Sequence, residues 1–324
     1  MESNQQLFAS PDIESAIDRS PLIINPDTSL VKAIALMGQV KNTSCQIIDS
    51  QKSEYQLDIK NSSTCALVTD GKELQGILTE RDIVKLTAKQ LAFDSVKVKD
   101  VMTQSVVTLK KSSLKDIFAA LFLFRRYRIR HLPIVDEANK LLGVITPASI
   151  RQATRPANLL KMRRVADVMS KNIIHAPMTK TVLEVAQLMA RHRVSCVVIT
   201  ESDQEENILI PVGIITERDI LQFQSLQTRL DNLKAETVMS TPLCLMSPED
   251  SLLAANQEMQ RRRVRRLVVS WNWGKGLGII TQTSMLRIFD PMEMYGVIET
   301  LQSTVQQLEQ EKAELLALVN QKSS

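Results

Sequence analysis

Apolar and polar positions predict a unit of helix, strand, strand and helix, most clearly in the third quarter of the chain. Across residues 181–189 (TVLEVAQLM) apolar side chains recur at helical spacing behind a threonine suited to capping. Residues 195–200 (SCVVIT) and 209–216 (LIPVGIIT) are β-branched runs typical of strands, and a polar loop separates them. Thr216 then stands where an N-cap belongs, before a second helix, and residues 172–176 predict a short leading strand.

The end of this unit recurs along the chain. Residues 76–83 read GILTERDI and residues 213–220 read GIITERDI, while weaker copies read GVITPASI at 143–150 and GIITQTSM at 278–285. The four glycines that open these copies are 67, 70 and 65 residues apart. A fixed period of this size indicates a repeat architecture.

Two further motifs recur with the repeats. One is Asp/Thr-Val-Met-Ser/Thr, which begins at residues 100, 167 and 237. The other is a hydroxyl residue that opens the first helix of each copy: Ser29, Ser113, Thr181 and Ser251. The chain is therefore read as four copies of one unit.

This unit resembles the cystathionine β-synthase (CBS) domain over residues from about 20 to 289, through the capped helix, the strand pair, the Gly-x-x-Thr-x-Arg-Asp turn and the Asp-Val-Met linker. The resemblance implies a mixed α/β (α+β) fold in which four repeats pair into two Bateman modules. Pairing also makes physical sense, because units this short are marginal alone. The expected boundaries are a tail at 1–19, repeats at 20–90, 100–155, 165–226 and 236–289, and a C-terminal helix at 291–321.

Repeat one carries an insertion. From Ser29 to Gly76 is 47 residues, against 30, 32 and 27 in the other copies. The additional residues form a polar loop at 46–63. Its purpose does not follow from its composition.

The C-terminal segment has a heptad pattern, with apolar residues alternately three and four apart. Its members are Ile298, Leu301, Val305, Leu308, Lys312, Leu315 and Val319. β-Branched residues at a with leucine at d favour a parallel two-stranded coil, so we expect a homodimer. The alternative is an amphipathic helix that packs back onto the modules. An array of this kind that ends in a parallel coil resembles the input half of bacterial signalling proteins, which would add a downstream signalling domain or protein as a partner.

Composition fits a soluble globular protein, with 44% hydrophobic and 23% charged residues among 324. A net charge of +4 and 4% aromatic residues argue against a nucleic-acid partner. The longest apolar run, at 119–124, is too short to span a membrane, and the N-terminus lacks the features of a signal peptide. Four scattered cysteines without C-x-x-C fit a reducing cytoplasm, with Cys65 and Cys196 expected as buried thiols.

The Thr-Glu-Arg-Asp corner offers the first candidate chemistry. Thr79 and Thr216 each close a strand and cap a helix, whose free N–H groups and dipole favour a phosphate. Asp82 and Asp219 follow three residues later, where an exposed carboxylate suits the vicinal hydroxyls of a ribose. The resemblance implies the same role for this aspartate.

A simpler interpretation is that Thr and Asp form only a helix cap. Repeats two and four keep the threonine (Thr146 and Thr281) but replace the aspartate with Ser149 and Ser284. We take this difference to favour a ligand role in repeats one and three.

Repeats two and four contribute basic runs, FRRYRIRHLPIV at 124–135 and MQRRRVRRLVV at 259–269. The resemblance implies that the residues just before each strand reach ligand phosphates in the cleft of a module, which suits arginine geometry. The expected nucleotide-binding set is completed by an arginine in each Thr-Glu-Arg-Asp turn; its basic members are Arg81, Arg130, His131, Arg218, Arg265 and Arg266. The arginines earlier in each run (Arg125, Arg126, Arg261 and Arg262) are expected as solvated helix ends.

Catalytic motifs are not evident. His131, His175 and His192 have no metal-ligand spacing, and no nucleophile elbow or Walker loop occurs. We therefore expect a non-catalytic cytoplasmic sensor without metal or cofactor. Its expected ligand is an adenosine compound: AMP, ADP, ATP or S-adenosylmethionine. The alternatives are an oligomerisation module without a ligand, and the input fragment of a larger kinase or cyclase.

Overall fold

The computed structural model describes residues 13–39, 64–71, 73–114, 117–154, 160–161, 163–203, 208–272 and 275–289. The insertion at 46–63 and the helix expected at 291–321 lie outside the described residues. The coiled coil therefore stays a prediction.

Each repeat builds one three-stranded sheet. The short first strand pairs parallel with the second, and the second pairs antiparallel with the third. The strands are β1 (Ile23–Ile24), β2 (Cys65–Asp70) and β3 (Glu73–Thr79) in repeat one; β4 (Leu109–Lys110), β5 (Leu132–Val135) and β6 (Leu141–Ile145) in repeat two; β7 (His175–Pro177), β8 (Cys196–Asp203) and β9 (Ile208–Thr216) in repeat three; and β10 (Leu245–Met246), β11 (Arg266–Trp271) and β12 (Gly276–Thr281) in repeat four.

A helix precedes the second strand of each repeat and another follows the third. These helices are α1 (Leu30–Gln39), α2 (Glu80–Ala88), α4 (Ile117–Tyr127), α5 (Pro147–Thr154), α8 (Val182–His192), α9 (Glu217–Ser225), α11 (Leu252–Arg261) and α12 (Gln282–Met285). Short helices α3 (Val98–Val101), α7 (Val165–Val168) and α10 (Ala235–Val238) lie in the linkers, and 3₁₀ turns occur at η2 (Ile13–Ala16), η3 (Lys111–Ser113) and η5 (Leu286–Phe289). The helix, strand, strand, helix order read from repeat three is confirmed.

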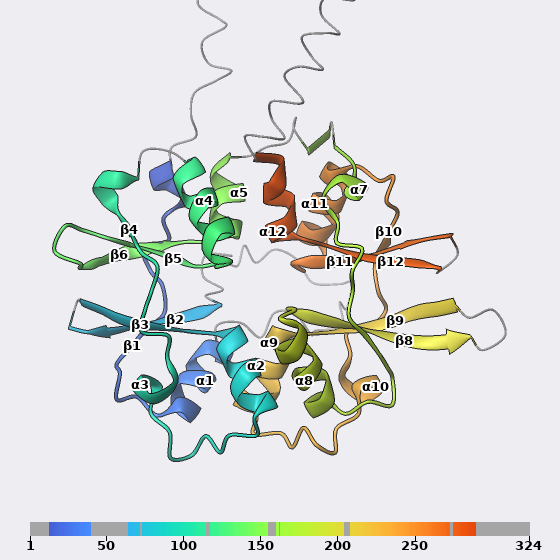
Figure 1. Cartoon of the computed structure of the whole chain (residues 1–324), viewed down its shortest axis with the longest axis horizontal. Helices are drawn as coiled ribbons and strands as arrows, with labels where there is room; N and C mark the ends of the chain where they lie inside the picture. The colour runs from blue at the N-terminus through green and yellow to red at the C-terminus, as the bar shows by residue number, and fades with distance from the viewer. Residues whose placement is uncertain are drawn as a thin grey trace, which may run out of the picture.

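The four repeats occupy the four quadrants of a flat array (Figure 1). Repeats one and two stack sheet against sheet as module one, and repeats three and four do so as module two. Between the modules α1 and α2 pack against α8 and α9, and α5 packs against α12. Each repeat thus has a partner on its sheet side and another on its helix side.

Apolar side chains cross from one module into the other. Val84 of α2 belongs to the hydrophobic core of repeat three, and Leu221 of α9 belongs to that of repeat one. Repeats two and four share a single core. The helix–helix seam is therefore a continuous part of the interior.

The repeated glycine and the Asp-Val-Met-Ser/Thr motif pack directly on each other. Ile77 and Thr103 exchange backbone hydrogen bonds of 3.0 and 2.9 Å. A Cβ atom built on Gly76 would lie 2.5 Å from Sδ of Met102. The glycine is needed because the linker passes over the third strand without room for a side chain.

The sequence places residues 13–19 in the N-terminal tail. In the structure they pack on the third strand of repeat two, as the linkers pack on the third strands of other repeats. Asp18 and Val144 exchange two backbone hydrogen bonds of 2.9 Å, and Ala16 is fully buried. This segment does not contain the Asp-Val-Met motif of the linkers. The motif therefore could not predict that it packs as a fourth linker.

Substituting the glycine in repeat two tests this packing. In Gly143→Ala the new Cβ would lie 2.5 Å from the backbone oxygen of Asp18, and backbone cannot swing aside as a side chain can. We expect a loss of about 1–3 kcal/mol in the free energy of unfolding, measured by urea denaturation. Gly278→Ala is the matched control, because its nearest neighbour is 3.0 Å away. Equal losses in the two variants would contradict the close approach at Asp18.

Candidate functional site

The Thr-Glu-Arg-Asp corners of repeats one and three are reciprocal helix caps. At α2 the backbone N–H and hydroxyl of Thr79 donate to Oδ2 of Asp82 at 3.1 and 2.7 Å. At α9 the backbone N–H of Thr216 donates to Oδ2 of Asp219 at 2.7 Å. In both, the aspartate N–H returns a bond to the threonine hydroxyl. This is a capping box, which satisfies two otherwise unpaired donors.

Repeats two and four close the same box with serine. The Thr146 N–H donates to Oγ of Ser149 at 2.9 Å, and the Thr281 N–H donates to Oγ of Ser284 at 2.8 Å. Serine thus replaces the aspartate without loss of the cap. Because a hydroxyl accepts the same bond, the change from aspartate to serine is compatible with a capping role, and the ligand role of the aspartates stays a prediction.

The aspartates are also less exposed than the sequence suggested. The Asp82 side chain is 13% exposed and pairs with Lys85 at 3.0 Å. Burial raises the pKa of Asp219, against the hydrogen bonds from Thr216 that lower it. Within the described part of the chain, Oδ1 of Asp219 accepts no hydrogen bond. That oxygen is the one able to receive a ligand hydroxyl.

Two glutamates that the sequence analysis passed over lie at the centre of the array. Glu80 is 3% exposed and Glu217 is 1% exposed. Each is the second residue of a Thr-Glu-Arg-Asp corner, where repeats two and four have Pro147 and Gln282. Retention of an ionisable residue in the duplicated octapeptide was the signal that could have pointed to them.

Glu80 of module one is held by two arginines of module two. Nε of Arg218 lies 3.3 Å from Oε1 of Glu80, and Nη2 of Arg265 lies 3.5 Å from the same oxygen. Burial alone would raise the pKa of Glu80, but the attraction of Arg265, Arg218 and the nearby arginines outweighs it and lowers the pKa. The carboxylate is therefore kept ionised in the interior.

Glu217 of module two is held in the mirrored way. Nε of Arg81 lies 3.1 Å from Oε1 of Glu217, and Nη2 of Arg130 bonds Oε2. Burial acts to lower the pKa of Arg130, and the charge and hydrogen bond of Glu217 more than compensate and raise it. Each module thus supplies two arginines to the buried glutamate of the other.

In module one, Thr64 is hydrogen-bonded both to the start of α2 and to the predicted site residue before β5. Its carbonyl oxygen accepts from the N–H of Glu80, at the start of α2, at 3.3 Å. Its hydroxyl is hydrogen-bonded to Nε2 of His131, just before β5. Burial, together with Arg130 and Arg265, lowers the pKa of His131 to about 3.

In module two, the backbone of Ser195 is hydrogen-bonded both to the start of α9 and to a predicted site residue of repeat four. Its carbonyl oxygen accepts from the N–H of Glu217 at 3.0 Å and from Nη1 of Arg266 at 2.7 Å. Nε of Arg266 is buried and has no hydrogen-bond partner. In each module, therefore, one residue is hydrogen-bonded both to the aspartate-capped helix (repeat one or three) and to a basic side chain of the partner repeat (two or four).

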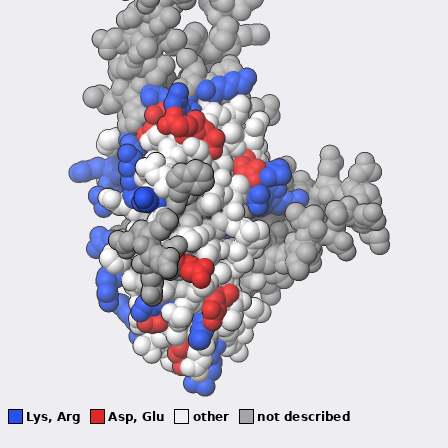
Figure 2. All heavy atoms as spheres, turned by 90° about the vertical axis from the view of Figure 1, so that its right-hand side faces the viewer, with Lys and Arg blue, Asp and Glu red and all other residues white. Residues whose placement is uncertain are grey.

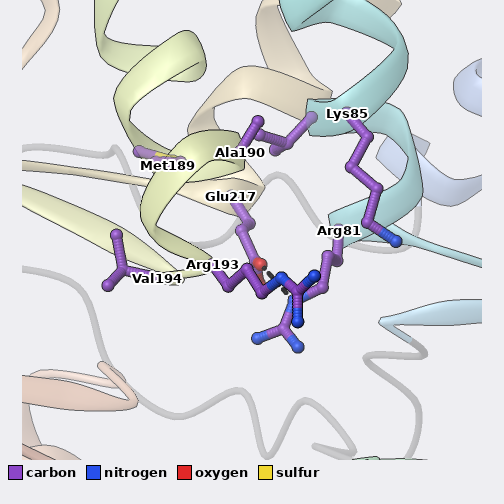
Figure 3. A pocket seen from close by; sticks show the side chains of 8 residues that line it. Arg81, Lys85, Met189, Ala190, Arg193, Val194 and Glu217 are labelled. Carbon is purple, nitrogen blue, oxygen red and sulfur yellow. Dashed lines mark hydrogen bonds and ion pairs between the residues drawn. The ribbon is translucent and has the colours of Figure 1, made fainter.

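An open hollow lies on the seam between the modules beside Glu217 (Figure 3). Its apolar wall comes from α2 and α8, and Arg81 and Arg193 lie next to each other in it. The full lining is Arg81, Val84, Lys85, Met189, Ala190, Arg193, Val194 and Glu217. Solvent thus reaches one side of the Arg81–Glu217 pair.

Outside this centre, one face of the molecule shows how surface charge is distributed. Acidic and basic side chains are interspersed on the face formed by repeats three and four (Figure 2). Among the described residues, no three potential metal ligands gather in one place. None of the helices in that part of the chain has the length and apolar character needed to cross a membrane.

Comparison with known proteins identifies the repeats. The family model "CBS domain" matches residues 12–89, 98–155, 165–225 and 235–290. The uncharacterized protein MJ1404 of Methanocaldococcus jannaschii is 21% identical over 308 residues, which are 91% of this chain and 65% of that protein. The chain thus spans less than two thirds of this relative's length.

A solved structure has the same fold. Protein MJ1225 of Methanocaldococcus jannaschii, whose description relates it to g-AMPK, superimposes with a TM-score of 0.67 at 21% identity over 86% of this chain and 99% of that one. A shorter match is a CBS domain protein of Pyrobaculum aerophilum complexed with AMP, with a TM-score of 0.34 at 25% identity over 38% of this chain and 89% of that one.

His131 predicts a pH dependence of stability. The pKa of this side chain is about 3 in the folded chain, whereas the pKa of a histidine in an unfolded chain is about 6.5. Between these values only the unfolded state takes up the proton, so stability is lost as pH falls from about 6.5, by at most about 1.4 kcal/mol per pH unit. Urea unfolding of the parent and of His131→Asn between these pH values measures it, and the variant should show a flatter dependence. His192→Gln, at an exposed site, is the control; an unchanged slope in His131→Asn would contradict the assignment.

Proposed function

Because the chain belongs to the CBS domain family, we propose that it is a regulatory protein whose two modules bind an adenosine compound without converting it. The candidates are AMP, ADP, ATP and S-adenosylmethionine. One ligand is proposed for each module, in the cleft between its two repeats. The protein is proposed to act in the cytoplasm.

The observation that carries this proposal is the convergence at Thr64 and Ser195. In each module the start of the aspartate-bearing helix and the basic residues of the partner repeat bond to the same residue. In module two these groups are a carboxylate, suited to ribose hydroxyls, and the Arg266 cation, suited to phosphate. In module one His131 is neutral near pH 7, so its proposed contribution there is a hydrogen bond rather than a charge. For module two, the proposed acceptor is Oδ1 of Asp219, the oxygen that the Thr216 N–H does not bond, and the proposed donor is Nε of Arg266, which is buried without a hydrogen-bond partner among the described residues.

A ligand-free assembly module is the second candidate. It is favoured by the fact that Arg130 and Arg265, assigned to phosphate, already have carboxylate partners in the protein. Titration with adenine nucleotides separates the two candidates.

Aspartate substitutions test the ribose role. We expect Asp219→Asn to abolish the module-two site and spare module one, and Asp82→Asn to do the reverse, as measured by calorimetry with AMP, ATP and S-adenosylmethionine. Asparagine is preferred to alanine because its side-chain oxygen still accepts the cap bond. Ser149→Ala and Ser284→Ala are controls for the cap itself, since each removes the bond that the serine accepts from the threonine N–H, in repeats without the aspartate, and should leave nucleotide binding unchanged. A double aspartate variant that binds nucleotide as tightly as the parent would rule out this role.

We also propose that the C-terminal helix signals by dimerising. The seam from residue 298 to 319 places Lys312 against its twin, which is unfavourable in a coiled coil. Lys312→Val should therefore tighten the dimer and Leu308→Lys should loosen it, as measured by sedimentation equilibrium. An intact chain that stays monomeric at micromolar concentration, whatever residue stands at 312, would mean that the helix packs on its own modules.

A further inference from the structure

We propose that Glu80 and Glu217 are internal counter-ions that the anionic group of a ligand must displace, so that the charge of the ligand determines whether binding in one module is transmitted to the other. This inference rests on the proposed function, because it assigns a role to the same clefts. It concerns two residues that touch the arginines rather than the ligand.

The first step of the argument is that each glutamate occupies the place a phosphate would take. Arg81 and Arg130 come from the two repeats of module one and converge on Glu217 of module two. Converging arginines are the usual partners of a phosphate group. In this chain the oxygen atoms between them belong to a carboxylate from the other module.

The second step is that the carboxylates do not neutralise the arginines. Glu217 and Glu80 each face two arginines, so the four arginines leave an excess of two positive charges. At Glu80 this excess is also seen in Arg265, where burial lowers the pKa to about 10 although Glu80 acts to raise it; at Glu217 the pKa of Arg130 is raised instead. A ligand that brings negative charge is attracted to this centre even while the glutamates are in place.

The third step is that an anion can reach the pairs. The arginine side chains are 34% exposed at Arg81, 26% at Arg130, 28% at Arg218 and 30% at Arg265, whereas the glutamates are almost fully buried. The hollow of Figure 3 opens onto the Arg81–Glu217 pair and places Arg193 beside it. Arg81 can therefore meet an incoming anion from this hollow, and the other three arginines each have part of the side chain exposed.

Displacement has a consequence across the seam. When a phosphate takes Arg81 and Arg130, Glu217 loses its partners, and Glu217 is the first residue of α9, whose cap contains Asp219. A phosphate in module one thus perturbs Asp219, the carboxylate proposed to bind ribose in module two. In the opposite direction, a phosphate bound by Arg218 and Arg265 perturbs Asp82 through Glu80. Adenosine, which has no anionic group, leaves both pairs intact and sends no such signal.

The test removes one counter-ion at a time. Inorganic phosphate is titrated against the parent, Glu217→Gln and Glu80→Gln at constant ionic strength, and the midpoint of thermal unfolding is followed. We expect each variant to bind phosphate about tenfold more tightly than the parent, which corresponds to about 1.4 kcal/mol. Adding Arg130→Met to Glu217→Gln should cancel the gain, because the freed arginine is then absent. Equal phosphate affinity in the parent and both single variants would overturn the proposal.

A matched control comes from the surface of repeat four. Glu258 also faces two arginines, Arg261 at 2.7 Å and Arg262, but on the exposed end of α11. Glu258→Gln makes the same change of charge away from the seam and should leave phosphate affinity at the parent value. A tenfold gain in this variant too would show that any freed arginine pair suffices, against the proposal.

Folding defects do not block the test. If Glu217→Gln is unfolded in buffer, phosphate should restore it, because the anion replaces the missing carboxylate. Failure of phosphate to restore it, with chloride at equal ionic strength as reference, would count against the counter-ion role.

The outcome is separable from that of the proposed function. A gain in phosphate affinity without binding of any adenosine compound would leave the counter-ion role standing and refute the nucleotide ligand. Nucleotide binding governed by Asp82 and Asp219, with ATP affinity unchanged in Glu217→Gln and Glu80→Gln, would refute the counter-ion role alone.

Discussion

Two almost fully buried carboxylates, Glu80 and Glu217, determine how the two modules are aligned. An ionised group in the interior is tolerated only when opposite charge and hydrogen bonds surround it. Here that charge comes from the other module in both directions, so neither module can slide or rotate along the seam without leaving a buried charge unpaired. Apolar residues such as Val84 and Leu221 supply adhesion across the same seam, but they would tolerate other alignments. The ionic exchange specifies which alignment is adopted.

Much of the local structure follows from the sequence, because its causes are local. Periodicity locates the helices and strands, and Thr79 and Thr216 predict helix starts from chemistry contained within four residues. The exchange between Glu217 and Arg130 could not be predicted, since these residues are 87 positions apart and belong to different modules. Knowing that repeats pair does not say which helices face each other. The aspartates show a further limit: one pattern of residues serves a cap and a ligand equally well, and only geometry shows that the cap is formed.

The two halves of the seam differ in chemistry although the repeats share one plan. Where repeat one has Val84 and repeat three has Leu221, repeat two has Arg151 on α5. Its Nη1 is buried without a hydrogen-bond partner, and burial lowers its pKa to about 10. The seam of repeats one and three is thus apolar around an ionic centre, whereas that of repeats two and four includes a partly buried cation. Such differences arise freely once the repeats are tethered in one chain, because each seam is then under separate selection.

The packing of residues 13–18 on Gly143 completes the first half of the chain. With that segment counted, each half of the chain is a complete set of linker, repeat, linker and repeat, and the crossing contacts of each half are closed within it. The chain is then built as two equivalent halves, in which Glu80 and Glu217 hold equivalent positions. In a homodimer of such halves both glutamates would be one residue, and a change there would alter both clefts at once. Joined in one chain the two halves can differ, as in the insertion of repeat one, which has no counterpart in repeat three.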